Sequence, residues 1–333
     1  MDEFEQILKT FEQSDAPLNE RLKDTIFKLI RCADQVPHPG EGATYKRWQM
    51  LAKVAKTNLN LVKWFESHLD ALSILHELNY KGLCNLDTKS SLWAVWAAEG
   101  SSQPLKVNHG QCTGIKNWCS GAESVNYALM TFKDTTQQSQ LVMVDVNQKG
   151  VHIDDSGWQS IGMQHTGTAS LTFDNVAVDF VGESNAYLDR PGFWHGAAGV
   201  AACWYGSTVR LADYLIQATQ QKPNDYRYLY LGEVFSALAT TQTMFKSVAA
   251  QIDLAPRVSH EFNIRVLRAQ VEKTANLVLN CVGKALGARP FCEDAVFAQH
   301  AADLPVFLRQ SHAAFDLKSI AELGLKEARV WDL

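Results

Sequence analysis

The sequence lacks the short motifs that mark several common enzyme classes. It contains no G-x-x-x-x-G-K-[S/T] phosphate loop, no H-E-x-x-H zinc motif and no G-x-S-x-G nucleophile elbow. These absences argue against P-loop nucleotide hydrolysis, zinc peptidase activity and α/β-hydrolase chemistry. The seven cysteines form no C-x-x-C pair and their number is odd. We therefore expect reduced, mostly buried thiols and no metal site.

The chain is also poor in net charge and in long apolar runs. Its 333 residues carry a formal net charge of −5, so we expect neither a nucleic acid nor an anionic membrane as a partner. No uninterrupted apolar run approaches the length of a membrane span. The first residues, MDEFEQILKTFEQSD, are acidic and amphipathic, unlike a secretory signal or a transit peptide. A cytoplasmic location is therefore the expectation.

Apolar residues recur at helical spacing through the first part of the chain. The stretch VPHPGEGAT, residues 36–44, interrupts this pattern with two prolines and two glycines, and a second helical stretch continues to about residue 78. We assign residues 1–82 to an N-terminal helical domain. The apolar positions of the helix before the interruption are Leu22, Ile26, Leu29 and Ile30.

Between residues 83 and 182 the apolar period changes to two. Four segments rich in Val, Leu, Phe and Thr are separated by clusters of Gly, Asn and Asp, which predicts strands. The pattern predicts a middle domain that is an antiparallel β barrel or sandwich. The four predicted strands are residues 91–98, 124–133, 139–147 and 170–178.

Helical spacing returns after residue 183 and persists to the end, which predicts a four-helix bundle over residues 183–333. One long helix ends at Gly287, and a last helix is expected over about 292–325. The whole chain is thus expected to be an α+β multidomain protein. Two apolar stripes define the central helices of the bundle: Leu231, Val234, Leu238, Phe245, Ala249 and Ile252 in one, and Ile264, Leu267, Val271, Ala275, Val278 and Val282 in the other.

The octapeptide GIKNWCSG, residues 114–121, stands out within the predicted β domain. It places a lysine, a tryptophan, a cysteine and a serine between two glycines. Taken alone it fits a β-turn with a buried tryptophan and a capping serine. A site for a flat aromatic ligand would use the same residues, because such a ligand needs an apolar plane beside it and a hydrogen-bond donor at its edge.

The order of helices, β domain and helical bundle resembles the acyl-CoA dehydrogenase superfamily of flavoproteins. GIKNWCSGAESVNYALM is similar to the family's G-x-K-x-W-I-[T/S] segment, and GWQSIGMQHTGTASLTFDNVAV to its W-x-x-x-G-M stretch. The resemblance covers nearly the whole chain, with a shortened N-terminal domain, and implies FAD as the cofactor. It further implies that Trp118 stacks near the flavin ring, that Ser120 hydrogen-bonds the flavin, and that Lys116 helps to shape the loop between strands.

The resemblance names a third cofactor contact in the β domain. EGSSQPLKV, residues 99–107, corresponds to a family G-S-D loop that lies near the cofactor pyrophosphate. Ser101 is therefore a candidate cofactor-binding residue, although Ser102 replaces the family's Asp. Small residues there would let backbone N–H groups approach an anion. A plain polar loop fits the same residues almost as well.

Two family segments that close the cofactor site from a neighbouring subunit are present in modified form. In YRYLYLGE, Arg227 lies one residue from the family's Arg position. In KALGARPF, Lys284 replaces a Gln and Gly287 keeps a Gly. A lysine can meet a phosphate as a point charge, so Arg227, Lys284 and Gly287 are candidate cofactor-binding residues. The alternative for Gly287 is an ordinary helix C-cap.

The family's catalytic carboxylate is missing from both of its known places. At the place of the family's Glu this chain has Ser311, and GFWHGAAGVAACWYG, at the start of the bundle, has no acid. The adjacent His312 is the candidate base, because a neutral imidazole can accept a proton near neutral pH. Related flavin monooxygenases of this fold use a His in this region. His312 and His195 both also fit a structural role, and Asp303 fits a cap or an ion pair better than a reacting group.

Three functions therefore stay open at this point. The leading one is an FAD-dependent oxidoreductase that acts on the CH–CH group of an acyl thioester or related acyl substrate, with acyl-CoA as the implied partner. The second is a flavin-dependent monooxygenase, and the third a non-catalytic partner or carrier-binding module. The resemblance implies a homodimer or tetramer, and an electron-transfer partner is possible under the leading hypothesis.

Overall fold

The computed structural model describes residues 3–82 and 86–328, and within them the chain forms two compact units. Unit 1 comprises the residues up to 37 together with 60–160 and 164–193. Unit 2 comprises 38–59, 161–163 and the residues from 194 onward. The predicted boundaries after residues 82 and 182 stay a prediction, and residue 83, at the first of them, lies outside the described residues.

Unit 1 contains two open four-stranded sheets. In the first the strand order is β1-β4-β5-β8, and in the second it is β2-β3-β7-β6. The first sheet consists of β1 (Trp93–Trp96), β4 (Tyr127–Lys133), β5 (Ser139–Asp145) and β8 (Asp179–Phe180). The second consists of β2 (Lys106–Asn108), β3 (Gln111–Cys119), β7 (Ala169–Ala177) and β6 (Val151–Asp154).

The α+β class and the order of helices, β region and helices are confirmed, but two details of the β prediction are wrong. The two sheets of the described residues are open, so of the predicted barrel or sandwich the closed barrel is excluded. Strands β1 and β4 pair in parallel, with Trp93 opposite Tyr127, whereas the sequence predicted antiparallel pairing throughout. Parallel pairing is possible here because the whole β2–β3 hairpin lies between β1 and β4 in the chain and provides the crossover.

The strand predictions hold best where β-branched and aromatic residues dominate. The four predicted strands correspond to β1, β4, β5 and β7. The octapeptide 114–121 was interpreted as a loop between strands, but most of it belongs to β3, which pairs with β2 on one side and β7 on the other. Pairing along both edges outweighs the weak strand propensity of its Gly, Lys and Asn residues.

Helix α4 (Leu59–Glu77) supplies much of the core of unit 1. Its residues Ala71, Ile74 and Leu75 are buried against Trp93 and Leu129 of the first sheet. At the end of the helix, Arg190 donates to Glu77 at 2.8 Å (Nη1 to Oε2), and its guanidinium lies over the Tyr187 ring. The other helices of this unit are α1 (Glu3–Gln13), α2 (Leu18–Leu29) and α5 (Ala186–Asp189).

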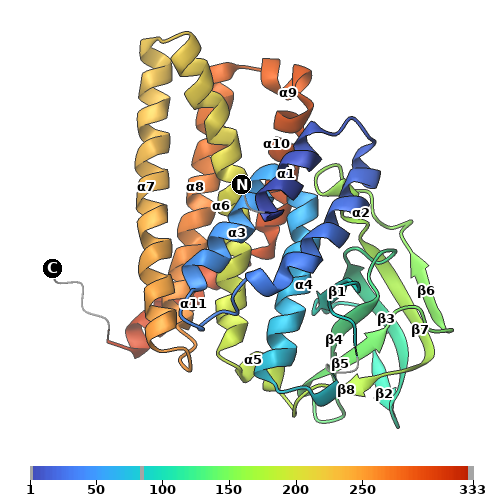
Figure 1. Ribbon diagram of the computed structural model, residues 1–333. Coiled ribbons are helices and arrows are strands. Elements are labelled where there is room, and N and C mark those ends of the chain that lie inside the picture. The colour runs from blue at the N-terminus through green and yellow to red at the C-terminus, as the bar shows by residue number, and fades with distance from the viewer. Residues whose placement is uncertain (1–2, 83–85, 329–333) are drawn as a thin grey trace. The chain divides into compact units, whose positions relative to one another are not determined.

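Unit 2 is a helical bundle in which α7 and α8 form an antiparallel hairpin (Figure 1). The predicted α8 stripe is buried throughout, and of the α7 stripe only Leu238 is half-buried. The helices are α3 (Thr44–Thr57), α6 (Gly192–Gln221, of which the part from Trp194 belongs here), α7 (Asp225–Leu254), α8 (Glu261–Leu286), α9 (Arg289–Glu293), α10 (Ala295–Phe307) and α11 (Ala314–Lys326).

The prediction of a single last helix over 292–325 is wrong, because the helical structure is interrupted between α10 and α11. At the break, the Ser311 hydroxyl accepts a hydrogen bond from the Ala313 amide at 3.2 Å, and Ala313 has a φ of 42°. The Asp316 carboxylate accepts from the His312 amide at 2.9 Å. Side chains that bond to nearby backbone groups in this way compete with helical hydrogen bonds.

The expectation of buried thiols is confirmed for the described cysteines, of which five are buried and Cys292 is exposed, and none of these six forms a disulfide. Cys84 lies outside the described residues. Among the described helices, none combines the length and apolar character needed to cross a bilayer.

Helix α3 packs closely on α6 in unit 2 at a glycine. A Cβ placed on Gly206 would lie 2.2 Å from the Ala52 carbonyl oxygen of α3, so no larger residue fits there. Gly232 of α7, in contrast, has open space around its Cβ position. The two glycines therefore have opposite roles: the first permits a helix contact, whereas the second only lowers helix propensity.

We predict opposite stability changes for alanine substitutions at these two positions. Gly206→Ala should destabilise unit 2 by about 1–3 kcal/mol because α3 must move away from α6. Gly232→Ala should raise stability by up to about 1 kcal/mol, since alanine is the better helix former at an exposed site. The midpoints of thermal unfolding of both variants measure the effect. Equal shifts in the two variants would contradict the close packing at Gly206.

Candidate functional site

Trp118 lies at a β-bulge in strand β3. The pairing between β3 and β7 changes register between Lys116 and Cys119, and Trp118 has a φ of 63°, which is uncommon for a residue other than glycine. A bulge of this kind redirects a side chain away from the regular alternation of a strand. As a result the indole is 60% exposed. The alternative of a turn with a buried tryptophan is therefore wrong.

A residue of the second motif segment, GWQSIGMQHTGTASLTFDNVAV, contacts Trp118 at the bulge. Trp158 packs edge-to-face against Trp118, with ring centroids 6.0 Å apart and an interplanar angle of 89°. The Trp158 indole N–H donates to the Gln164 carbonyl at 3.3 Å, which holds this ring in the loop before β7. One face of unit 1 therefore presents a tryptophan whose edge is supported and whose remaining surface is open to solvent.

Ser120 is the first of three hydroxyl groups in a row. Its Oγ lies 3.0 Å from the Thr168 hydroxyl, which lies 2.9 Å from the Thr166 hydroxyl. Each hydroxyl both donates and accepts, so the chain can run with Thr168 donating to Ser120. In that arrangement the Ser120 O–H is left to donate to another group. The half-buried Ser120 can thus offer a hydrogen-bond donor beside Trp118.

Two buried indoles fix the backbone around this serine. The Trp96 N–H donates to the Ser120 carbonyl at 3.2 Å, and the Trp64 N–H donates to the Thr166 carbonyl at 2.8 Å. Gly121, with a φ of 73°, donates its amide to the same Thr166 carbonyl at 2.8 Å. These contacts hold the backbone at Ser120 and at Thr166, the two ends of the hydroxyl chain.

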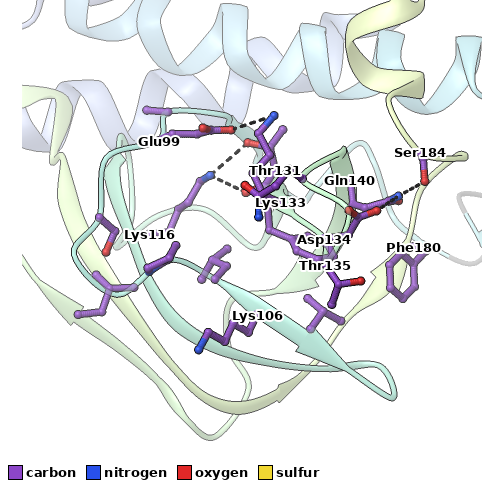
Figure 2. Close-up of a pocket in the computed structure, with 18 of the residues that line it drawn as sticks. Glu99, Lys106, Lys116, Thr131, Lys133, Asp134, Thr135, Gln140, Phe180 and Ser184 are labelled. Atoms are coloured by element: carbon purple, nitrogen blue, oxygen red, sulfur yellow. Dashed lines mark hydrogen bonds and ion pairs between the residues drawn. The ribbon is translucent and has the colours of Figure 1, made fainter.

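Lys116 connects the two sheets rather than shaping a loop. Its Nζ donates to the Thr131 carbonyl at 2.6 Å and lies 3.2 Å from the Thr131 hydroxyl on β4. The side chain is buried, and desolvation lowers the pKa of Lys116 to about 8, a shift that Cys119, Glu99 and Cys112 oppose only in part. Figure 2 shows Lys116 reaching across to Thr131.

Ser101 lies away from the Trp118 face, in the loop after β1. Its hydroxyl accepts from the Gln103 amide at 3.1 Å, as in a polar turn. The same loop lines a cleft of about 880 Å³ in unit 1, to which both sheets contribute. Trp118 and Ser120 do not line this cleft, so the structure does not bring Ser101 together with them.

Arg227, Lys284 and Gly287 lie at the same end of the α7–α8 hairpin in unit 2. Arg227 is in the first turn of α7, Lys284 in the last turn of α8, and Gly287 caps α8 with a φ of 70°. Arg227 donates from Nη1 to the carbonyls of Ala218 and Lys222 at 2.8 and 2.6 Å, so it also closes the end of α6. Lys284 is exposed there.

The candidate base His312 is exposed and lies in the break before α11. Ser311, at the place of the family's carboxylate, is buried. Asp303 is buried and accepts a hydrogen bond from the Met163 amide at 2.5 Å, a structural contact of the kind that the sequence suggested. His195 is buried, with its Nε2 at 3.0 Å from the Val258 carbonyl.

Comparison with solved structures shows the same fold in flavoproteins. Butyryl-CoA dehydrogenase from Megasphaera elsdenii aligns with a TM-score of 0.80 at 13% identity, over 98% of both chains. Glutaryl-CoA dehydrogenase from Mycobacterium smegmatis, solved with FADH2, aligns with a TM-score of 0.78 at 11% identity, over 96% of this chain and 92% of that one. The chain has the acyl-CoA dehydrogenase fold.

The same fold also occurs in a monooxygenase. TdsC from Paenibacillus sp. A11-2, a dibenzothiophene monooxygenase solved with FMN and indole, aligns with a TM-score of 0.74 at 13% identity, over 98% of this chain and 96% of that one. No protein-family model and no curated protein sequence matches the chain. The acyl-CoA dehydrogenase fold is thus evident in three dimensions at an identity too low to carry a function with it.

Two contributors to the Trp118 face were not singled out from the sequence of this acyl-CoA dehydrogenase-like chain. Thr168 and Trp158 both lie in GWQSIGMQHTGTASLTFDNVAV, but only the three-dimensional structure shows that Thr168 contacts Ser120 and that Trp158 contacts Trp118. The one available signal was the joint presence of the two motif segments. Spacing along the chain does not reveal which residue of one segment faces which residue of the other.

The hydroxyl chain leads to a stability prediction. Thr168→Val keeps the shape of the side chain but removes both hydroxyl contacts, leaving the buried Thr166 hydroxyl without that partner. We expect a loss of about 1–3 kcal/mol in unfolding free energy. Thr172→Val, at an exposed position of the adjoining strand β7, should change it by less than about 0.5 kcal/mol. Urea denaturation compares the two, and similar values for both would rule out a stabilising role for the hydroxyl chain.

Proposed function

We propose that this protein is a flavoprotein oxidoreductase of the acyl-CoA dehydrogenase fold, with Trp118 and Ser120 forming the flavin-binding face of unit 1. One observation carries the proposal: a β-bulge leaves the Trp118 indole 60% exposed beside a serine that can donate a hydrogen bond. Tryptophan side chains are on average mostly buried. An uncovered tryptophan held in place by a neighbouring ring suits the apolar plane of a flat cofactor.

The residues present fit a flavin in part. Trp118 offers an aromatic plane and Ser120 a hydroxyl donor, which are the groups that a flavin ring needs. Lys284 and Arg227 supply positive charge for a pyrophosphate, although Arg227 also holds the end of α6. By analogy with the family, we propose that these two residues and Gly287 act from a second copy of the chain, and that Ser101 lies near the pyrophosphate. A homodimer or tetramer and FAD as the flavin are accordingly part of the proposal.

A bound flavin would accept a hydride from the substrate. Ser120 would then hydrogen-bond the ring, and Trp118 would cover it and exclude water from one side. Removal of the acidic proton of an acyl thioester needs a base, for which His312 is the candidate. An acyl-CoA or related acyl substrate and an electron-accepting partner complete the proposed reaction.

The proposal predicts that the purified protein shows the visible absorption spectrum of a flavin, or acquires it with FAD or FMN. Trp118→Ala should weaken flavin binding about 10-fold or more, because stacking on an aromatic side chain contributes roughly 1–3 kcal/mol. The variant should stay folded, since the indole is largely exposed. Fluorescence titration with FAD measures the affinity.

Ile153→Ala is the matched control, because Ile153 is also exposed, at 44%, on strand β6 of the same sheet. It should leave flavin affinity unchanged. A wild-type protein that stays colourless with both flavins would refute the proposal. If the colourless protein co-purified tightly with a second protein, the hypothesis of a non-catalytic binding module would replace the flavoprotein proposal.

Flavin monooxygenase activity is the second candidate, and the missing carboxylate favours it. Ser311 stands where a dehydrogenase of this family has its Glu, and His312 beside it is exposed. A flavoprotein that activates oxygen does not remove an α-proton from an acyl thioester, so it needs no carboxylate for that step. TdsC shows that the fold also occurs in a monooxygenase.

We predict that the two reactions separate on their use of oxygen. Under the monooxygenase hypothesis the chemically reduced protein consumes oxygen rapidly and hydroxylates a bound substrate. Under the dehydrogenase hypothesis an acyl-CoA bleaches the flavin without oxygen. His312→Ala should lower the rate of whichever reaction is found about 10²–10⁴-fold. An oxygen electrode and anaerobic spectra make the distinction, and an unchanged rate in the variant removes His312 from the mechanism.

A further inference from the structure

The cleft between the two sheets of unit 1 is large enough for a small organic molecule. Its volume is about 880 Å³, within the range of ligand-binding cavities. Strands β2 and β3 of the second sheet contribute one wall, and β4 with the loop after it contributes another (Figure 2). It does not include the proposed flavin-binding residues Trp118 and Ser120.

Lys116 is the buried charged group of this cleft. The side chain is only 4% exposed, and both of its hydrogen-bond partners among the described residues, the carbonyl and hydroxyl of Thr131, are uncharged. A buried ammonium group without a counter-ion is costly, since neutral acceptors only partly replace its hydration. An ammonium group has three donors, so a third hydrogen remains for a ligand in the cleft.

The acids of the lining do not neutralise this lysine. Glu99 lies at 3.9 Å from Lys133, and both side chains are substantially exposed. The Asp134 carboxylate accepts from the amides of Thr136 and Gln138 in its own turn, at 2.8 and 3.0 Å. Glu183 is exposed. Glu99 and Glu183 are exposed to solvent, and Asp134 accepts hydrogen bonds within its own turn. The buried charge on Lys116 therefore stays positive.

The rest of the lining is both apolar and polar. Phe132 and Phe180 lie with ring centroids 6.2 Å apart and border the cleft, and Phe180 is half exposed. Gln140 hydrogen-bonds Ser184 at the same side, as Figure 2 shows. The exposed Lys106 adds a second positive charge on β2. An occupant with an apolar body and one oxyanion group matches this combination.

We propose that the cleft between the sheets is a second ligand site of this protein, which binds a small organic oxyanion, a carboxylate or a phosphate monoester, with its charge on Lys116 and its apolar body against Phe132 and Phe180. The site excludes Trp118 and Ser120, although Ser101, the proposed pyrophosphate contact, lies in its lining, and its test does not require a flavin.

The experiment compares three six-carbon ligands by calorimetric titration of the full chain: hexanoate, hexyl phosphate and 1-hexanol. Either anion should bind at least about 10-fold more tightly than the alcohol, and the tighter of the two identifies the oxyanion. Lys116→Met should reduce the affinity for the anions about 10-fold or more and leave that for 1-hexanol unchanged. Lys133→Met, which removes an exposed lysine of the same lining, should change affinity less than about 3-fold.

The wild-type protein provides a readout that does not depend on the folding of a variant. Because the pKa of Lys116 is lowered to about 8 by burial, the amine loses its proton as the pH rises from 7 to 9.5, and hexanoate affinity should fall over this range. The other titratable groups that face Lys116 are Glu99 and the thiols of Cys112 and Cys119, and burial raises the pKa values of the two thiols to about 11 and 12.

Two outcomes would overturn the proposal: anions that bind no more tightly than 1-hexanol, or hexanoate binding that does not weaken between pH 7 and 9.5. Trp118→Ala separates this proposal from the flavin proposal, because it should abolish or weaken flavin binding while leaving hexanoate affinity unchanged. Loss of both in that variant would show that the cleft is not an independent site.

Discussion

The pairing of strand β3 with strand β7 determines the arrangement of the candidate site. Directly before the bulge, from Gly114 to Lys116, the two strands pair in regular register, and Lys116 points between the sheets, where it reaches Thr131 on β4. Within the bulge the alternation is broken, and Trp118 is turned out to solvent. After it, Ser120 lies beside Thr168. Lys116, Trp118 and Ser120 thus have three different roles, because the bulge lies among them. The first contacts the other sheet, the second exposes its ring, and the third can donate a hydrogen bond.

Polar groups do much of the positioning in unit 1. Trp64 and Trp96 bury their rings but donate their N–H groups to carbonyls on either side of the site, so that each indole both packs and directs the backbone. Lys116 is the costly member of this arrangement, since its charge is buried with neutral partners. The same charge gives the inter-sheet cleft its preference for an anion.

The family resemblance and the geometry support different parts of the functional proposal. The fold is shared with dehydrogenases and a monooxygenase at 11–13% identity, so it does not choose between the two proposed reactions. The exposed indole and the adjacent hydroxyl are properties of this chain. The resemblance predicts a carboxylate at the position of Ser311, so the base of the proposed dehydrogenase reaction depends on a different residue, for which His312 is the candidate.

The sequence by itself determined the fold class, the order of helices and strands and the buried stripe of α8, because apolar periodicity reflects which face of an element is buried. It also singled out Trp118 and Ser120. It could not show that β1 runs parallel to β4, that the last helix breaks at Ser311, or that Thr168 bonds Ser120. Only the tertiary structure decided these, because strand partners and hydrogen-bond partners far apart in the chain leave no local pattern.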